Sequence, residues 1–142
     1  MLLTALEEVA AGECDRLMVL MPPGSAKSTY ASVLFPAWWL QRRPQGAVIA
    51  AAHTGELARH FGRGVRALVE QHGARLGYGV SRHEGAAGRF RTTLGGSYYA
   101  VGVRGPVTGR RADLVLIDDP VRSAAEAERS RARAHLWDWF RA

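Results

Sequence analysis

One lysine stands in a setting that could handle phosphate. Lys27 is the only lysine among 19 basic side chains, and the other 18 are arginine. It follows a Pro-Pro-Gly-Ser-Ala segment and precedes Ser28. Arginine and lysine are interchangeable on a solvated surface, so a chain this rich in arginine keeps lysine where the chemistry demands it. We expect the compact ammonium of Lys27 to lie between phosphate oxygens.

The residues around Lys27 follow the order of a phosphate-binding loop. In the pattern G-x-x-x-x-G-K-[ST], backbone N–H groups surround the phosphates, the lysine reaches the β and γ oxygens, and the hydroxyl binds Mg²⁺. Met21 and Ala26 occupy the two glycine positions, so the match departs from the pattern twice. A helix that begins here adds oriented donors and a positive dipole. The alternative is a plain helix start, capped by Ser25. The predicted nucleotide-binding residues are Pro23, Gly24, Ser25, Ala26, Lys27, Ser28 and Thr29.

Two carboxylates end an apolar run late in the chain. Leu114–Ile117 is followed by Asp118 and Asp119, which is the form of a Walker B strand. The first carboxylate would hold the water shell of Mg²⁺, and the second would orient or deprotonate the attacking water. Ser28 and Asp118 are therefore the predicted metal residues, and Asp119 is a predicted catalytic residue. The alternative is an Asp-Asp-Pro turn that closes a strand.

The elements that must position these residues form an α/β pattern with buried parallel strands. The carboxyl ends of such strands share one edge, so the phosphate loop, His53 and the acid pair should converge there. Apolar runs predict strands at Arg16–Met21, Ala47–Ala52 and Leu114–Ile117, and alternation predicts a hairpin of Arg89–Thr93 with Ser97–Val103. The stretch His72–Gly88 is expected to be irregular. The predicted helices are Leu2–Ala11, Ala26–Leu40 with a kink or early end at Pro36, Gly55–Gln71 capped by Thr54, and a last helix from the capping box at Ser123 to about Phe140.

Length and composition fit one soluble, intracellular domain over residues 1–142. The chain is 47% hydrophobic and 23% charged, close to globular averages, with no apolar run long enough to span a membrane. The first residues turn acidic at once and lack a basic n-region, so we expect no secretory signal, and the single cysteine excludes an internal disulfide. Residues 31–111 hold twelve basic and three acidic side chains. This imbalance suits contact with a polyanion, and a solvated surface is the alternative.

Several segments together resemble a known family. Met21–Thr29, Val48–Ala58 and Gly109–Arg122 resemble the N-terminal ATPase domain of tailed-bacteriophage terminase large subunits, the motors that pump DNA into empty capsids. Trp137–Phe140 resembles the aromatic segment after Walker B in the same branch, and both departures in the loop are typical of that branch. The resemblance implies a P-loop NTPase-like fold of the additional-strand type, with a mostly parallel sheet flanked by helices.

The resemblance also implies roles and partners. Lys27 would contact the β- and γ-phosphates of ATP, Ser28 and Asp118 the magnesium, and Asp119 the hydrolytic water. Arg110, before the acid pair, would be an arginine finger or a DNA contact, with a plain surface arginine as the alternative. The implied partners are double-stranded DNA held by its phosphates, the portal or procapsid, the small terminase subunit and further copies of the chain. The implied location is the cytoplasm of the bacterial host, with no membrane.

The chain departs from that family after the acid pair. A strand with the coupling motif, and a nuclease domain beyond it, are expected there, so we expect an incomplete fold. The absent strand would lie between the strand before the Lys27 loop and the strand before Asp118, so the remaining parallel strands must leave a gap, rearrange or pair with another chain. Two other functions stay open. A helicase- or recombination-type ATPase is one, since Val48–Ala58 is also similar to helicase motifs, and a non-enzymatic remnant that binds nucleotide or DNA weakly is the other.

Overall fold

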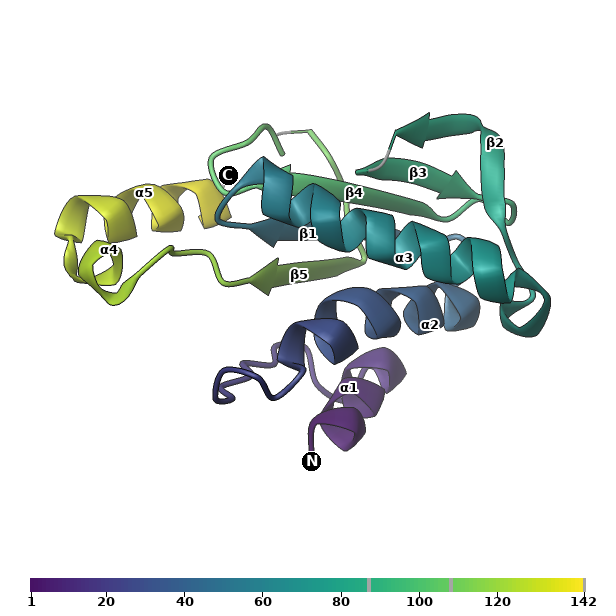
Figure 1. The fold of residues 1–142 in the computed structure, drawn as a ribbon, viewed down its shortest axis with the longest axis horizontal. Helices are drawn as coiled ribbons and strands as arrows, with labels where there is room; N and C mark the ends of the chain where they lie inside the picture. The colour runs from purple at the N-terminus through teal and green to yellow at the C-terminus, as the bar shows by residue number, and fades with distance from the viewer. Residues whose placement is uncertain (87, 108, 142) are drawn as a thin grey trace.

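The computed structural model describes residues 1–86, 88–107 and 109–141. Five strands form one sheet in the order β2-β3-β4-β1-β5, with helices on both sides (Figure 1). The fold is therefore α/β. The strands are β1 (Ala47–Ala52), β2 (Val80–Ala86), β3 (Arg89–Thr92), β4 (Ser97–Gly102) and β5 (Leu114–Asp118).

The sheet is mixed, which corrects the expectation of a mostly parallel one. β1 runs parallel to β4 and to β5, whereas β2–β3 and β3–β4 are antiparallel pairs. The predicted strand at Ala47–Ala52, the strand before Asp118 and the β3–β4 hairpin are confirmed. The irregular stretch expected at His72–Gly88 is wrong. Its residues lack an apolar alternation, and β2 forms there because the free edge of β3 offers backbone hydrogen bonds.

The first predicted strand, Arg16–Met21, does not form. The segment lies outside the sheet, and Leu17, Met18, Leu20 and Met21 are between 38% and 87% exposed. Among the described strands, β5 pairs with β1 alone, so its outer edge is open. Arg16–Met21 does not pair with that open edge, so its backbone takes no part in the sheet hydrogen bonds.

The predicted helix Leu2–Ala11 forms with those bounds, and the other predicted helices form with altered ones. Thr54 caps α3 as expected, because its Oγ1 accepts a hydrogen bond from the N–H of Leu57, and the helix runs past the predicted end at Gln71. The last predicted helix is divided at Arg129, whose backbone is extended. Ser123 still caps the first part, with its Oγ accepting from the N–H of Glu126. The helices are α1 (Leu2–Ala11), α2 (Phe35–Arg42), α3 (Gly55–Leu76), α4 (Ala124–Glu128) and α5 (Ser130–Arg141).

A wide helical turn follows the Lys27 loop. The π-helix η1 (Thr29–Leu34) continues directly into α2, and the N–H of Phe35 donates to the carbonyl of Tyr30, five residues back. The helix continues through Pro36, so the predicted early end is wrong. Proline has no N–H to donate to the carbonyl of Ser32, which favours the wider turn at this place.

The main core lies between the sheet and helices α1, α2 and α3, which Figure 1 shows on one side. Its largest fully buried side chains are Tyr98 and Phe90, whose rings stack with centroids 5.2 Å apart. A smaller cluster of Ile49, Ala51 and Val101 lies on the opposite face, against Trp139 of α5. The alternate residues of β1 thus enter two different cores, as fits an interior strand of the sheet.

Helices α4 and α5 lie beyond the carboxyl ends of β1 and β5 (Figure 1). Hollows between these helices and the strand ends are lined by residues from both. None of the helices in the described ranges is long and apolar enough to cross a bilayer.

Candidate functional site

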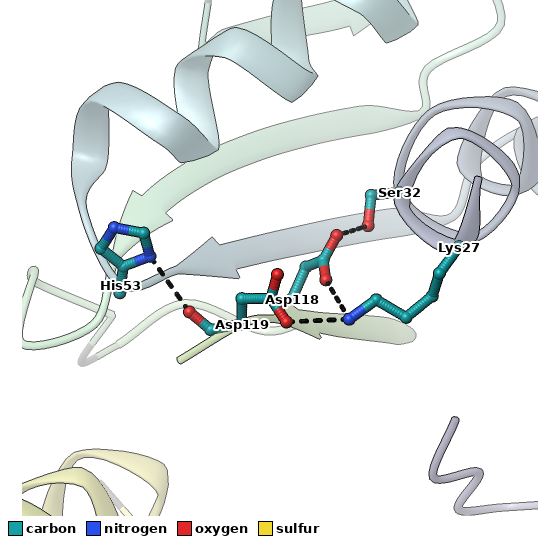
Figure 2. A network of polar contacts seen from close by, with 5 residues as sticks. All are labelled: Lys27, Ser32, His53, Asp118 and Asp119. Carbon is teal, nitrogen blue, oxygen red and sulfur yellow. Dashed lines mark hydrogen bonds and ion pairs between the residues drawn. The ribbon is translucent and has the colours of Figure 1, made fainter. Parts of the chain in front are cut away.

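Lys27, Asp118 and Asp119 meet at the carboxyl end of β5, as Figure 2 shows. The Nζ atom of Lys27 lies 3.1 Å from Oδ1 of Asp118 and 2.8 Å from Oδ1 of Asp119. Asp119 is 92 residues from Lys27 along the chain. Local sequence cannot bring them together, so their meeting is a product of the tertiary fold.

The two carboxylates differ sharply in burial. The Asp118 side chain is 8% exposed and the Asp119 side chain 63%, while Lys27 is intermediate at 24%. Asp118 shares the β5 face of Leu114 and Leu116, which packs against the main core. Because successive residues of a strand alternate in direction, the next carboxylate leaves that face and reaches solvent. One carboxylate is held in the interior, and the other is exposed to water.

Two serines hold Asp118 from the helix that follows the loop. The buried hydroxyl of Ser32 donates to Oδ2 of Asp118 at 2.7 Å, and Ser28 forms a further hydrogen bond with the same carboxylate. Ser28 and Ser32 are four residues apart, so a helical turn places them on one side. Sequence reasoning missed Ser32. Its spacing from Ser28 was the available signal, but nothing local identified Asp118 as the shared partner.

These contacts set the charge states of the lysine and the buried carboxylate. Burial alone would raise the pKa of Asp118, but hydrogen bonds from Ser28 and Ser32, together with Lys27, outweigh it and hold that pKa below its ordinary value of 3.8. The hydrogen bond to Asp119 raises the pKa of Lys27 above its ordinary value of 10.5, against the opposing effect of burial. At neutral pH, Lys27 and Asp118 therefore form an ion pair.

The loop before Lys27 contains two residues with left-handed backbone. Pro23 and Gly24 are the central residues of a turn closed by a hydrogen bond from the N–H of Ser25 to the carbonyl of Pro22. Gly24 has φ 78°, as a type II turn requires at that position. Ala26 has φ 59°, a conformation that costs a residue with a Cβ atom about 1–2 kcal/mol. The phosphate-loop pattern has its second glycine here, and strain retained in this way is characteristic of functional sites.

The loop offers donors that suit a phosphate group. The hydroxyl of Ser25 is buried, and no hydrogen-bond partner is found for it in the described part of the chain. Such atoms are rare and point to a missing partner. The first N–H groups of a helix also have no partners within the helix, and they begin here at Lys27. A hydroxyl, an ammonium and backbone N–H groups together fit an oxyanion.

A divalent cation also fits the residues present. Ser28 and Asp118 place a hydroxyl and a carboxylate oxygen side by side. Mg²⁺ prefers such hard oxygen ligands, and it commonly takes one or two from the protein and the rest from phosphates and water.

The end of β1 contacts the acid pair through His53. Its Nδ1 atom lies 3.2 Å from the backbone carbonyl of Asp119, as Figure 2 shows. Asp119 has φ 44°, so its backbone is also left-handed. The expected convergence of His53 with the acid pair is therefore present, and the contact is made by the main chain of Asp119.

Arg110 lies apart from these residues. Its guanidinium packs over the ring of Tyr99 at 3.9 Å from the centroid. Tyr99 belongs to the cluster on the sheet face opposite α2 and α3. The structure thus brings together Lys27, Ser28, Asp118 and Asp119, but it does not bring Arg110 to them. Of the other predicted loop residues, Pro23, Gly24 and Thr29 are exposed beside the site.

A family model matches most of the chain. The family model described as "Terminase large subunit, T4likevirus-type, N-terminal" matches residues 18–140, a range that contains every site residue discussed above. No curated protein and no solved structure matched the chain significantly.

Proposed function

Because the chain belongs to the family of T4-like terminase large subunit N-terminal domains, which indicates a part in phage DNA packaging, we propose that it supplies ATP hydrolysis to that process. The observation that carries the proposal is the single ammonium of Lys27 held between Asp118 and Asp119, at 3.1 and 2.8 Å. A cation next to two carboxylates, at the end of a phosphate-type loop, is the charge arrangement that ATP hydrolysis needs.

In this proposal, nucleotide binding rearranges the ion pairs of Lys27. Its ammonium leaves the carboxylates for the β- and γ-phosphate oxygens, and Pro23–Thr29 surrounds the phosphates. Ser28 and Asp118 hold Mg²⁺, which when bound neutralises charge developing on the phosphates. The buried Asp118 suits this fixed role, because Ser32 orients its carboxylate.

Release of Lys27 leaves Asp119 free to act on water. The exposed carboxylate orients a water molecule, and as the bond from this water to the γ-phosphorus forms, the bond to the β–γ bridging oxygen breaks. The products are ADP and orthophosphate, and the proton of the water passes to Asp119 or to solvent. His53 fixes the backbone of Asp119 and so limits the positions that its side chain can take.

The proposed macromolecular partner is double-stranded DNA, bound through its phosphates without base readout. Its support is the arginine-rich middle of the chain, which holds twelve of the 19 basic residues. Arg110, apart from the acid pair, remains proposed as a DNA contact or as an arginine finger toward a neighbouring copy in an oligomer. The portal or procapsid and the small terminase subunit are further proposed partners, in the cytoplasm of the host.

The test is Mg²⁺-dependent ATP hydrolysis by the purified chain, with and without duplex DNA. Lys27→Ala and Asp119→Asn should each lower turnover about 100-fold or more, because each removes a group from the transition state. Asp138→Asn is the matched control, since Asp138 is an exposed carboxylate of α5 outside the site, and it should leave turnover unchanged.

Three results would contradict the proposal. Turnover that survives Lys27→Ala would remove the site assignment. ATP binding without turnover by the unaltered chain would favour a non-enzymatic remnant. Stimulation by single-stranded DNA alone would favour a helicase-type ATPase.

A further inference from the structure

A second hollow lies behind the acid pair, between the strand ends and helices α4 and α5. It has a volume of about 270 Å³ and is lined by residues that include His53, Arg104, Val121, Arg122 and Glu126. It adjoins a wider hollow of about 410 Å³ that Asp119 lines, and both share His53, Val121 and Arg122. The smaller hollow is thus next to the site of Lys27, but it has its own lining.

Two guanidinium groups give this hollow a positive charge. Within the described ranges, the ion pairs and side-chain hydrogen bonds found do not involve the guanidinium of Arg104 or of Arg122. The one carboxylate in the lining is Glu126, and its Oε2 already accepts a hydrogen bond from the backbone N–H of Arg122 at 2.8 Å. Two exposed arginines and one partly satisfied carboxylate therefore line the hollow.

Arg104 is held in a conformation that its residue type disfavours. It has φ 78° and occupies the third position of a turn closed by a 2.7 Å hydrogen bond from the N–H of Gly105 to the carbonyl of Gly102. A positive φ at this position selects glycine, and glycine is present at both ends of the same turn. An arginine retained where glycine would be unstrained indicates that its side chain has a use.

We propose that Arg104 and Arg122 together bind a phosphate oxyanion in this hollow, at a site separate from the Lys27 loop. Guanidinium groups present paired N–H donors that match the oxygens of phosphate. The volume lies below the range typical of pockets for drug-sized ligands, which favours an ion or a single phosphate group over a whole nucleotide. Free orthophosphate and a phosphate of a DNA backbone share this chemistry. The site does not depend on ATP hydrolysis at Lys27.

The test is equilibrium dialysis of radiolabelled orthophosphate against the full chain at low salt. Arg122→Gln and Arg104→Gly should each weaken binding roughly tenfold, since each removes charge-assisted hydrogen bonds. Arg104→Gly also relieves the strained turn, so its melting temperature should equal or exceed that of the unaltered chain. Lost affinity in a chain of unchanged stability cannot be attributed to unfolding. Arg129→Gln, an exposed arginine outside the lining, is the matched control and should bind normally.

Lys27→Ala separates this site from the proposed nucleotide site. Orthophosphate binding that survives Lys27→Ala and is lost in Arg122→Gln supports the second site, whether or not the chain hydrolyses ATP. Binding lost in Lys27→Ala but kept in both arginine variants would overturn it, as would no binding by the unaltered chain.

A short duplex DNA added as competitor identifies the source of the phosphate. Displacement of bound orthophosphate by the duplex from the unaltered chain and from Lys27→Ala alike would assign the hollow to a backbone phosphate. Retention of orthophosphate would assign it to the free ion.

Discussion

The molecule contains two largely apolar segments of six residues, Arg16–Met21 and Ala47–Ala52, and only the second forms a strand. Both predict a buried strand, and polar residues of the site follow both. Ala47–Ala52 becomes the interior strand β1, hydrogen-bonded to β4 on one side and β5 on the other. Arg16–Met21 stays outside the sheet, with four of its side chains exposed.

The difference lies in the neighbours rather than in hydrophobicity. The exposed run has larger apolar side chains than the alanine-rich β1. β1 has parallel partners on both edges and a core on both faces, whereas no described strand lies beside Arg16–Met21. An apolar run therefore becomes a strand only where other strands satisfy its backbone. Lys27 still reaches the acid pair, because the helix after the loop is anchored by α2 in the main core.

The largest effect is expected from placing a charge in each run. Val48→Asp buries a carboxylate at a position that is 1% exposed, so it should lower the free energy of unfolding by about 4 kcal/mol or prevent folding. Met18→Asp changes a side chain that is 82% exposed, so it should change the free energy of unfolding by no more than about 0.5 kcal/mol. Urea unfolding followed by circular dichroism measures both. A comparable loss from Met18→Asp would mean that the first run is buried after all.

The acid pair allows a similar comparison between a buried and an exposed carboxylate. Asp118→Asn should cost about 2 kcal/mol of unfolding free energy, because it removes the charge that Lys27, Ser28 and Ser32 surround. Asp119→Asn should cost less than about 0.5 kcal/mol, since that side chain is largely exposed. The same urea titration compares the two variants. Equal losses of unfolding free energy in the two variants would show that the difference in burial between Asp118 and Asp119 does not affect stability.

The ion pair between Lys27 and Asp118 should make the free energy of unfolding depend on pH. The pKa of Asp118 is lowered on folding, so its stabilisation is present above pH 3.8 and is lost as pH falls through the folded pKa. The pKa of Lys27 is raised, so its stabilisation is present below pH 10.5 and is lost as pH rises through the folded pKa.

The measurement is the difference in unfolding free energy between the unaltered chain and Lys27→Met across pH. We expect a plateau of about 1 kcal/mol between these limits that declines at both ends. Lys27→Arg, which keeps the charge, serves as the control. A difference that does not change with pH would contradict the ion pair.

The smallest effect concerns the strained loop after the exposed run. Ala26→Gly should stabilise the chain by about 0.5 kcal/mol, because relief of the left-handed backbone slightly exceeds the added entropy of the unfolded chain. Ala67→Gly, at an exposed position within α3, should instead destabilise by about 1 kcal/mol. Thermal unfolding of the two variants in parallel would resolve the sign. Destabilisation by Ala26→Gly would argue against the left-handed loop.

Local patterns predicted those parts of the fold that depend on local physics. The cap at Thr54 and the β3–β4 hairpin are each specified by residues close in sequence. The failures, Arg16–Met21 and β2, depend on which strand edges are available, and this is decided by distant segments. The residues of the candidate site also fall into a group that local motifs predicted and a group that depends on distant segments. Motif spacing identified Lys27 and the acid pair, but the support of Asp118 by Ser32 and the contact of His53 with Asp119 exist only after folding.

Pro36 affects the direction in which Lys27 and the serines after it point around the helix axis. It is fully buried in α2, and the π-turn just before it adds a residue to the winding. One residue corresponds to about 100° of rotation around an α-helix. If the turn reverted to ordinary α-helical winding, Lys27, Ser28 and Ser32 would swing away from Asp118. The alignment of a cation and two hydroxyls with one carboxylate therefore depends on the missing N–H of an imino acid one turn further along.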